Sequence, residues 1–413
     1  MDEAYRVIEH VARVSYGRLV SYLAARSRDV ASAEDALADA FAAALRTWPN
    51  DGVPHKPESW LLQAARRRLI DRARLDHTRD QHSAGLRQMM AEAESRTADH
   101  TFPDERLKLL FVCAHPAIDP RVHTPLMLQV VLGVDAAAIA AAFLSSPATV
   151  GQRLTRAKTK IRDAGIAFEV PAGADLAPRM SAVLEAIYAA YGHGWDGVDG
   201  ADPKRRGLAD EALWLARTLV ELLPNEPEAL GLLALLLYCE ARRGARRNAD
   251  GAYVPMSAQD TRAWSEPQLI EAERHLQLAA TAGRPGRFQL EAAIQSAHVD
   301  RVRTGRADWS AIACLYAGLL QVAPTFGALL GRAAAVAEAE GPAAGLACLD
   351  ALPADAMQSH QPYWAVRAHL EQRLGHAAQA RAAYERAIQL TDDAAVQAFL
   401  AQRAGGTADP GST

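Results

Sequence analysis

Apolar residues recur three and four positions apart along most of this chain, and that spacing constrains its fold more than any other feature. A segment with this period buries one face as an α-helix, whereas a strand would need strict alternation. Alanine is abundant and aromatic residues make up only 6% of the 413 residues, which reinforces the pattern because alanine costs least to place in a helix. We therefore predict an all-α fold of two to four domains.

The sequence also indicates where the protein acts. No run of 18 or more apolar residues is free of charge, so we expect no membrane span. The first residues, MDEAYRVIEHVARV, are acidic and then amphipathic, unlike the basic and apolar regions of a signal peptide. The four cysteines lie far apart without CxxC spacing, which favours isolated buried thiols in a reducing compartment. These features predict a cytoplasmic protein.

Three helices are expected in the first part of the chain. The first covers 5–28, the second runs from about 31 to 48 with Ser32 as its N-cap, and the third runs from 58 to about 76. The turn-forming residues PNDGVPHKP separate the second helix from the third.

The apolar pattern weakens over residues 77–103, which are mainly polar. We interpret them as a linker, although an ordinary surface helix over 84–95 fits the pattern nearly as well. The pattern then returns and predicts helices at 104–114, 120–132, 135–144 and 147–163.

The last two of these helices predict a helix-turn-helix, because only a short turn joins them. Ser146 suits an N-cap and Pro147 the first helical position. One face of the second helix is apolar and comprises Val150, Leu154, Ala157 and Ile161. The opposite face is polar and basic, and comprises Thr149, Gln152, Arg153, Arg156 and Lys160. A second helix with a basic outer face is typical of DNA-binding helix-turn-helix motifs.

The net charge of −4 argues against nucleic-acid binding along the whole chain. The charged residues are nevertheless grouped into separate acidic and basic stretches. The acidic stretch contains Asp29, Glu34, Asp35 and Asp39. The basic stretches contain Arg66, Arg67, Arg68, Arg72 and Arg74, and Arg153, Arg156, Lys158, Lys160 and Arg162. Local basic patches of this kind are what phosphate contact requires.

Beyond residue 175 the chain is predicted to be helical to about 403. Gly341 and Gly375 open similar segments and lie 34 residues apart, which is the tetratricopeptide period. A generic helical bundle is the alternative. The residues after Gly405 are expected to be disordered.

No residue pattern indicates catalysis. Cys113, His115 and His123, with His100, fit no zinc-ligand spacing. GHGWDGVDG lacks the GK[ST] ending of a phosphate-binding loop. We therefore expect no metal, no cofactor and no enzymatic activity.

Longer segments resemble a known family. AEDALADAFAAALRTW and SWLLQAARRRLIDRAR resemble the two central helices of sigma factor region 2, and VDAAAIAAAFLSSPATVGQRLTRAKTKIR resembles region 4. The absence of the middle region marks the extracytoplasmic-function (ECF) group. FVCAHPAIDP, GRPGRFQLEAAIQSAH and PNEPEALGLLALLL look like segments of the ECF subgroup with a C-terminal tetratricopeptide-like domain.

The resemblance implies a domain organisation and a function. It implies a cytoplasmic sigma factor that binds core RNA polymerase and promoter DNA, with a tail that controls it in cis, either by contacting the sigma domains or by binding polymerase. The alternatives are a helix-turn-helix regulator with a tetratricopeptide sensor that does not bind polymerase, and a pure scaffold. The implied domains are region 2 at 1–76, the linker at 77–103, region 4 at 104–168, the regulatory domain at 175–404 and the tail at 405–413.

The resemblance also assigns roles to residues. Glu34, Asp35, Asp39 and Phe41 would contact polymerase. The −10 element would be bound by Trp60, Arg66, Arg67, Arg68, Arg72 and Arg74, and the −35 element by Thr149, Gln152, Arg153, Arg156, Lys158 and Lys160. Trp60 could stack on a base, but its spacing favours packing in the core.

Three residues depart from the family pattern. Ala38 stands where a Gln is usual in the polymerase-binding helix, Arg67 where an Asn is common, and Ala138 where a Glu is usual. These departures leave the promoter sequence and the affinity for polymerase open.

Overall fold

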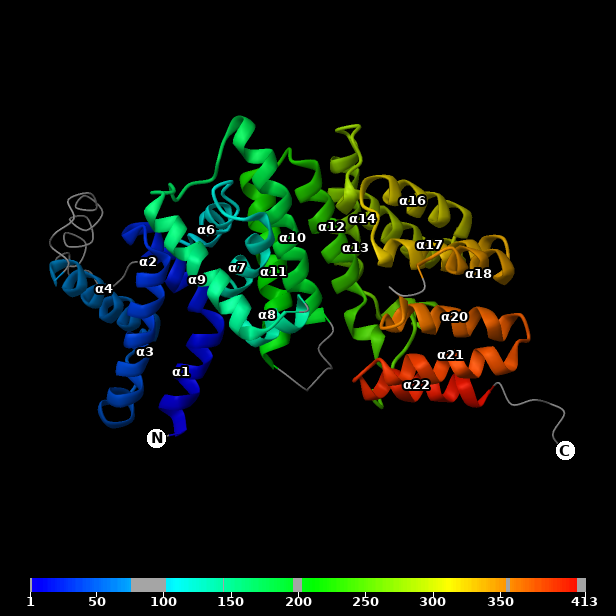
Figure 1. Ribbon diagram of the computed structural model, residues 1–413, viewed down its shortest axis with the longest axis horizontal. Coiled ribbons are helices and arrows are strands. Elements are labelled where there is room, and N and C mark those ends of the chain that lie inside the picture. The colour runs from blue at the N-terminus through cyan, green and yellow to red at the C-terminus, as the bar shows by residue number, and fades with distance from the viewer. Residues whose placement is uncertain (1, 76–101, 144, 196–202, 354–356, 407–413) are drawn as a thin grey trace. The chain divides into compact units, whose positions relative to one another are not determined.

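The computed structural model describes residues 2–75, 102–143, 145–195, 203–353 and 357–406. Every named element in these ranges is a helix, and the β-pairing recorded there is an isolated bridge between Arg247 and Tyr253. The predicted all-α fold is therefore confirmed (Figure 1).

The chain forms two compact units, Met1–Thr218 and Leu219–Thr413. Both segments predicted as sigma domains lie within the first unit. Most of the predicted linker at 77–103 and most of the predicted tail at 405–413 lie outside the described residues. The predicted domain limits themselves stay predictions.

The first unit opens with four helices: α1 (Asp2–Val14), α2 (Tyr16–Ser27), α3 (Val30–Asp51) and α4 (Pro57–Leu75). The predicted single helix over 5–28 is wrong, because the chain breaks at the buried Ser15 into α1 and α2. The predicted cap Ser32 is also wrong. Asp29 is the N-cap of α3, and its carboxylate accepts a hydrogen bond from the Ser32 amide at 3.1 Å.

The helix α3 runs further than its sequence predicts. It continues through Pro49 to Asp51 and is capped by Gly52, whose φ of 89° lies where only glycine is unstrained. Trp48 stays buried as a result.

Four more helices follow: α6 (Arg106–Cys113), α7 (Pro120–Val130), α8 (Ala136–Ala142) and α9 (Pro147–Asp163). The start of α9 is as predicted. The hydroxyl of Ser146 accepts a hydrogen bond from the Thr149 amide at 3.2 Å, and Pro147 is the first helical residue. The predicted apolar face is buried in full: Val150, Leu154, Ala157 and Ile161.

Two further helices complete the first unit. The helix α10 (Leu176–Trp195) packs against α7 and α6, and α11 (Pro203–Leu222) follows it. Arg106 on α6 binds Asp104 at 2.8 Å and also Glu211 on α11, and it lies over the Trp214 ring. Within the first unit, α10 therefore shares a core with the helices before it, and α11 is joined to α6 through Arg106.

The second unit is a succession of helices. Neighbours along the chain pack together, such as α12 with α13, α16 with α17, and α20 with α21. The helices are α12 (Pro227–Ala241), α13 (Glu266–Ala280), α14 (Arg287–Val299), α15 (Arg301–Thr304), α16 (Trp309–Val322), α17 (Phe326–Ala339), α18 (Pro342–Asp350), α20 (Gln361–Arg373), α21 (Ala377–Gln389) and α22 (Ala394–Gly405).

The two glycines 34 residues apart occupy equivalent places. Gly341 lies between α17 and α18, and Gly375 between α20 and α21. Their φ angles of 107° and 81° turn the chain back, which a residue with a Cβ resists. Within α18, a Cβ at Gly345 would stand 2.4 Å from the Ala337 Cβ, so these two helices pack closely.

Glu228 joins two of the family-like segments. Its carboxylate accepts hydrogen bonds from the backbone amides of Phe288 and Gln289, at 2.9 and 3.2 Å, at the start of α14. The residue thus caps α14 from the start of α12, and its negative charge suits a helix N-terminus. A Cβ at Gly286 would stand 2.3 Å from the Glu228 carboxyl carbon, so the neighbouring glycine makes room for this cap.

Glu228→Ala should lower the free energy of unfolding by about 1–3 kcal/mol, because the two amides lose their partner inside the fold. Urea unfolding followed by circular dichroism measures the change. Glu221→Ala, at an exposed position of α11, is the matched control and should change stability by less than about 0.5 kcal/mol. Equal effects of the two substitutions would contradict the capping role.

Candidate nucleic-acid interface

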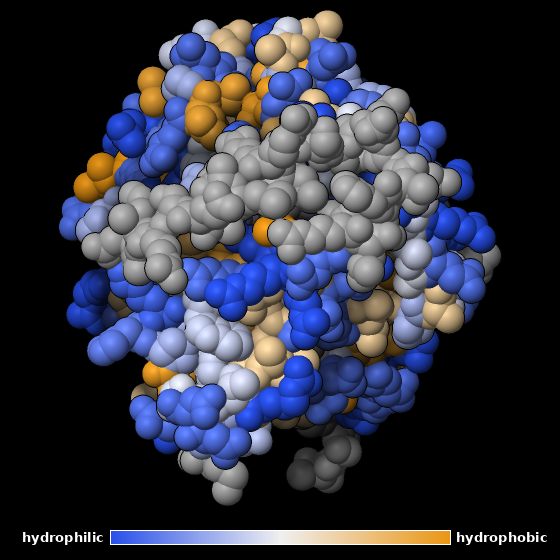
Figure 2. Space-filling model, turned by 90° about the vertical axis from the view of Figure 1, so that its left-hand side faces the viewer, coloured by the Kyte–Doolittle hydropathy of each residue, from blue (hydrophilic) through white to orange (hydrophobic). Residues whose placement is uncertain are grey.

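The helix α3 carries the residues predicted to contact polymerase. Asp35 and Asp39 are exposed, and Phe41 is partly buried. Seen from the side on which α3 and α4 lie, the surface is mainly hydrophilic with scattered hydrophobic residues (Figure 2). The two aspartates can therefore attract a basic partner, and charges at such a rim chiefly steer and orient docking.

Glu34 differs from these two aspartates because it is largely buried and paired inside the first unit. Its carboxylate lies 2.6 Å from the Lys158 ammonium of α9, and the two side chains are 15% and 13% exposed. Tyr16 of α2 also hydrogen-bonds to Glu34. Burial raises the pKa of the Glu34 carboxyl above its ordinary value, although Lys158 favours the charged form. Burial and the neighbouring Glu34 likewise raise the pKa of Tyr16.

The basic face of α4 is partly occupied. Arg67 and Arg68 are exposed. Arg66 binds the Tyr22 hydroxyl, and Arg72 forms an ion pair with Asp35 at 3.0 Å. The side chain of Arg74 lies outside the described residues. Arg67 and Arg68 thus face solvent, while Arg66 and Arg72 touch neighbouring helices.

Trp60 packs against another tryptophan. Its ring meets the Trp48 ring edge-to-face with centroids 5.3 Å apart. This contact agrees with the packing interpretation, while a role of Trp60 at the −10 element stays a prediction.

The outer face of α9 is open within the first unit. Gln152, Arg153, Arg156 and Lys160 are exposed, and Thr149 is partly buried with its hydroxyl 2.8 Å from that of Ser146. Lys158 is the exception because it turns to Glu34. Four long polar side chains on one side of a capped helix can reach base edges and phosphates.

The sequence did not indicate which residues pack around the Tyr22 ring. The guanidinium of Arg26 lies 3.5 Å from the ring centroid, and Phe102 meets the ring edge-to-face at 5.4 Å. Arg18 also lies over the Phe102 ring, at 4.2 Å, and binds Glu58 at 2.6 Å. Apart from the Arg26–Tyr22 pair, which lies within α2, these contacts join segments far apart in the chain, so no local period could have signalled them.

Other kinds of site find little support in the described part of the chain. No group of three or more His, Cys, Asp or Glu residues there could hold a metal ion, and no helix described is long and apolar enough to cross a membrane. The cysteines are free, but the prediction that all are buried is wrong, because Cys314 is exposed.

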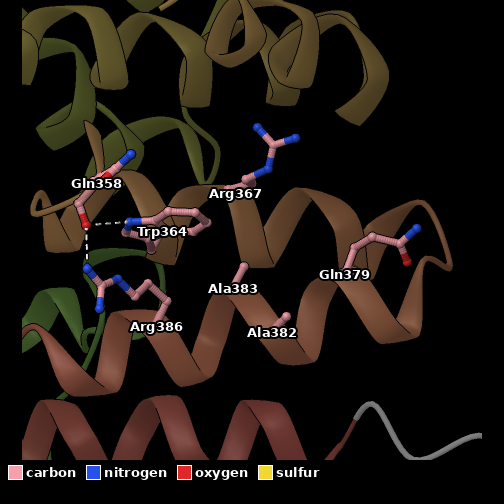
Figure 3. Close-up of a pocket in the computed structure, with 7 residues that line it drawn as sticks. All are labelled: Gln358, Trp364, Arg367, Gln379, Ala382, Ala383 and Arg386. Carbon is pink, nitrogen blue, oxygen red and sulfur yellow. Dashed lines mark hydrogen bonds between the residues drawn. The ribbon is translucent and has the colours of Figure 1, made fainter. Parts of the chain in front are cut away.

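The second unit has a shallow groove between α20 and α21 (Figure 3). Several of its polar groups are already engaged: the Gln358 carbonyl accepts from Trp364 at 3.3 Å and from Arg386 at 3.0 Å, and Arg367 binds Asp350 at 2.7 Å. The groove therefore lies between two packed helices, and its described lining presents no cluster of reactive groups.

Two family models match parts of the chain. Residues 12–78, which include α2, α3 and α4, match sigma-70 region 2. Residues 179–280 match a family of unknown function, DUF6596. The protein named "Uncharacterized protein R00370" of Rhizobium meliloti (strain 1021) is 36% identical over 389 residues, which cover 93% of this chain and 91% of that protein. No solved structure matches the chain significantly.

Trp60→Ala should lower the free energy of unfolding by about 2 kcal/mol or more, because it removes half of an aromatic pair and leaves a cavity beside Trp48. Thermal or urea unfolding of the full chain measures this loss. Gln63→Ala, at an exposed site on the same helix, should have little effect. An unchanged stability in Trp60→Ala would indicate that the ring does not brace the fold.

Proposed function

Because the chain belongs to the same family as the Rhizobium meliloti protein and carries a sigma-70 region 2 in its first unit, we propose that it is a sigma factor. It binds core RNA polymerase in the cytoplasm, recognises promoter DNA and starts transcription. The observation that carries the proposal is that the region 2 match covers the helices bearing the acidic and arginine-rich faces, α3 and α4.

The surfaces of the first unit support a division of tasks. The exposed Asp35 and Asp39 on α3 suit a basic surface of polymerase. The exposed Arg67 and Arg68 on α4 suit the phosphates of a strand opened at the −10 element.

The helix-turn-helix formed by α8 and α9 supports −35 recognition. Arg153 and Arg156 are long and exposed and can read guanine bidentately, whereas Lys160 suits phosphate. We assign residues 1–76 to region 2 and 104–168 to region 4, joined by 77–103. With no middle region between them, the arrangement is that of the ECF group.

The remaining helices are proposed as the regulatory part, at 175–404, with tetratricopeptide-like hairpins. The support is the equivalent placement of Gly341 and Gly375 in successive hairpins. Helical repeats stack into extended binding surfaces, which suits control in cis of the sigma domains.

Asp35→Lys with Asp39→Lys should weaken binding to purified core polymerase by about tenfold or more, because both charges then repel a basic partner. Pulldown and in vitro transcription measure the two consequences, binding and promoter-dependent initiation. The control is Glu9→Lys, the same charge change at an exposed residue of α1. Binding that survives the double reversal would contradict the role of Asp35 and Asp39, and an unaltered chain that neither binds core polymerase nor initiates transcription would instead favour a DNA-binding regulator that uses no polymerase.

Arg153→Ala and Arg156→Ala should each cost about 1–3 kcal/mol of promoter binding and relax the sequence preference at one position, since each removes a bidentate contact to a base. Gel-shift titration with promoter fragments varied at the −35 element measures both effects. Thr159→Ala, exposed on the same helix, is the control. A uniform loss across all sequences would reassign the two arginines to phosphate contact.

A further inference from the structure

We propose that the second unit holds a binding site for a small phosphate-bearing ligand, where the side chains of Arg242, His298 and Arg301 come together at the end of α14. The site goes beyond the proposed function, and its test needs neither polymerase nor promoter. Three features support it: the placement of these side chains, the pairing of the carboxylates around them, and two buried donors that have no acceptor.

The three residues reach one patch from different segments. Gln295 and His298 lie three positions apart in α14, about one helical turn, and Arg301 opens the short α15 three positions later. Arg242 follows α12, and its guanidinium donates to the Gln295 side chain at 2.9 Å. The helices α12 and α14 pack against each other (Figure 1). Arg242 is therefore held on the face of α14 that carries His298.

The patch is sheltered but open to water. Arg242, His298 and Arg301 are all partly buried. The His298 ring meets the Trp309 ring edge-to-face with centroids 5.4 Å apart, and the Arg301 guanidinium lies 5.0 Å from the centroid of the Trp264 ring. Aromatic rings beside a charge exclude water, which strengthens its attraction for an ion of opposite sign.

Positive charge accumulates in this patch. Burial, together with the charges of Arg242 and Arg301, lowers the pKa of His298 to about 4, so its imidazole is neutral at pH 7. Burial and Arg242 also lower the pKa of Arg301 below its ordinary value. The charged neighbours that cause both shifts are cations. A bound anion would act in the opposite direction on both groups.

The described carboxylates of the surrounding helices already have partners. The ion pairs are Glu240–Arg243 at 3.0 Å, Glu291–Arg287 at 2.8 Å and Asp300–Arg303 at 2.9 Å, and Glu273 accepts hydrogen bonds from Tyr238 and Ser296. Arg301 differs, because its printed acceptors in the described part of the chain are the neutral carbonyls of Met256 and Gln259. Its charge therefore suits an anion from outside the chain.

Two N–H groups beside the patch are buried and donate to no described acceptor. They are the Arg301 Nε and the Trp264 Nε1, and Trp264 is only 6% exposed. A buried donor without an acceptor costs free energy, and an indole N–H can only donate. Because the Arg301 guanidinium lies over the Trp264 ring, an oxyanion bound here can accept from both side chains.

Phosphate is the oxyanion that fits this patch best. Its oxygens point in several directions, and the donors of Arg242, Arg301 and Trp264 come from three segments of the chain. Guanidinium groups bind phosphate through paired N–H donors, and a phosphate dianion balances two arginines. A carboxylate has one charge and two oxygens in one plane, so it would satisfy fewer of these groups.

Calorimetric titration of the full-length protein with inorganic phosphate, at constant ionic strength, tests the site. We expect saturable binding of one phosphate per chain. Arg301→Gln should weaken this binding about tenfold or more, because it removes a charged donor pair. Arg303→Gln is the matched control on the same short helix, at an exposed position, and should leave the affinity unchanged. No saturable binding, or equal weakening by the two substitutions, would overturn the site.

The His298 ring gives a second readout on the unaltered protein, which holds even if Arg301→Gln loses helical content by circular dichroism. His298→Gln identifies the ring signals in the nuclear magnetic resonance spectrum. Without phosphate the ring should stay neutral from about pH 8 to about pH 5.5. Saturating phosphate should raise the pKa of His298, because a nearby anion favours the charged form, and the signals should then shift at a higher pH. An unchanged titration would place the bound phosphate elsewhere and overturn the site.

Two further ligands establish the chemistry that the site accepts. Glycerol 3-phosphate binding more tightly than inorganic phosphate would identify a phosphorylated metabolite as the source, whereas the reverse order would identify the free ion. Either order supports a phosphate site. Acetate should bind about tenfold more weakly than phosphate or weaker still, since it has fewer oxygens and less charge. Acetate that binds as tightly as phosphate would overturn the phosphate assignment.

Discussion

The first unit depends on a pair of opposite charges placed where water is largely excluded. Moving a carboxylate and an ammonium out of water costs several kcal/mol for each ion, and their attraction offsets this only when the geometry is good. Glu34 and Lys158 meet that condition at 2.6 Å, with Tyr16 as a further donor to the carboxylate. Such a pair contributes little net stability but penalises any arrangement in which only one partner stays buried. The pair therefore specifies which helix faces meet, while adding little to the free energy of unfolding.

Local features of the sequence predicted the elements, because they act over a few residues. Ser146, Pro147 and the apolar period of α9 each act within two turns, and the structure has all of them as expected. The break at Ser15 escaped prediction because apolar residues continue across it with helical spacing. The cap of α3 was misplaced because Asp29 and Ser32 are both good capping residues, and only the geometry distinguishes them.

Contacts between residues far apart in the chain could not be predicted from the sequence, for a different reason. A charged residue such as Glu34 reads as a solvated position unless its partner is known, and Lys158 lies 124 positions away. The same limit applied to the segments PNEPEALG and GRPGRFQ, which were read only as a resemblance. In the structure Glu228 from the first segment caps the helix that the second one opens. Their residues therefore serve the fold of the second unit.

The matched regions bear on how a tail can control the sigma domains. The family of unknown function matches from residue 179, inside α10, and continues through α11 into α12 and α13. Because α10 packs on α7, and Arg106 of α6 binds Glu211 and covers Trp214 on α11, this family's first helices share a core with the helices that carry α8 and α9. The first helices of the part proposed to regulate thus lie in the unit that contains the proposed DNA-binding helix. Since the end of α7 also meets Gly17, α10 packs on a helix that contacts α2 directly.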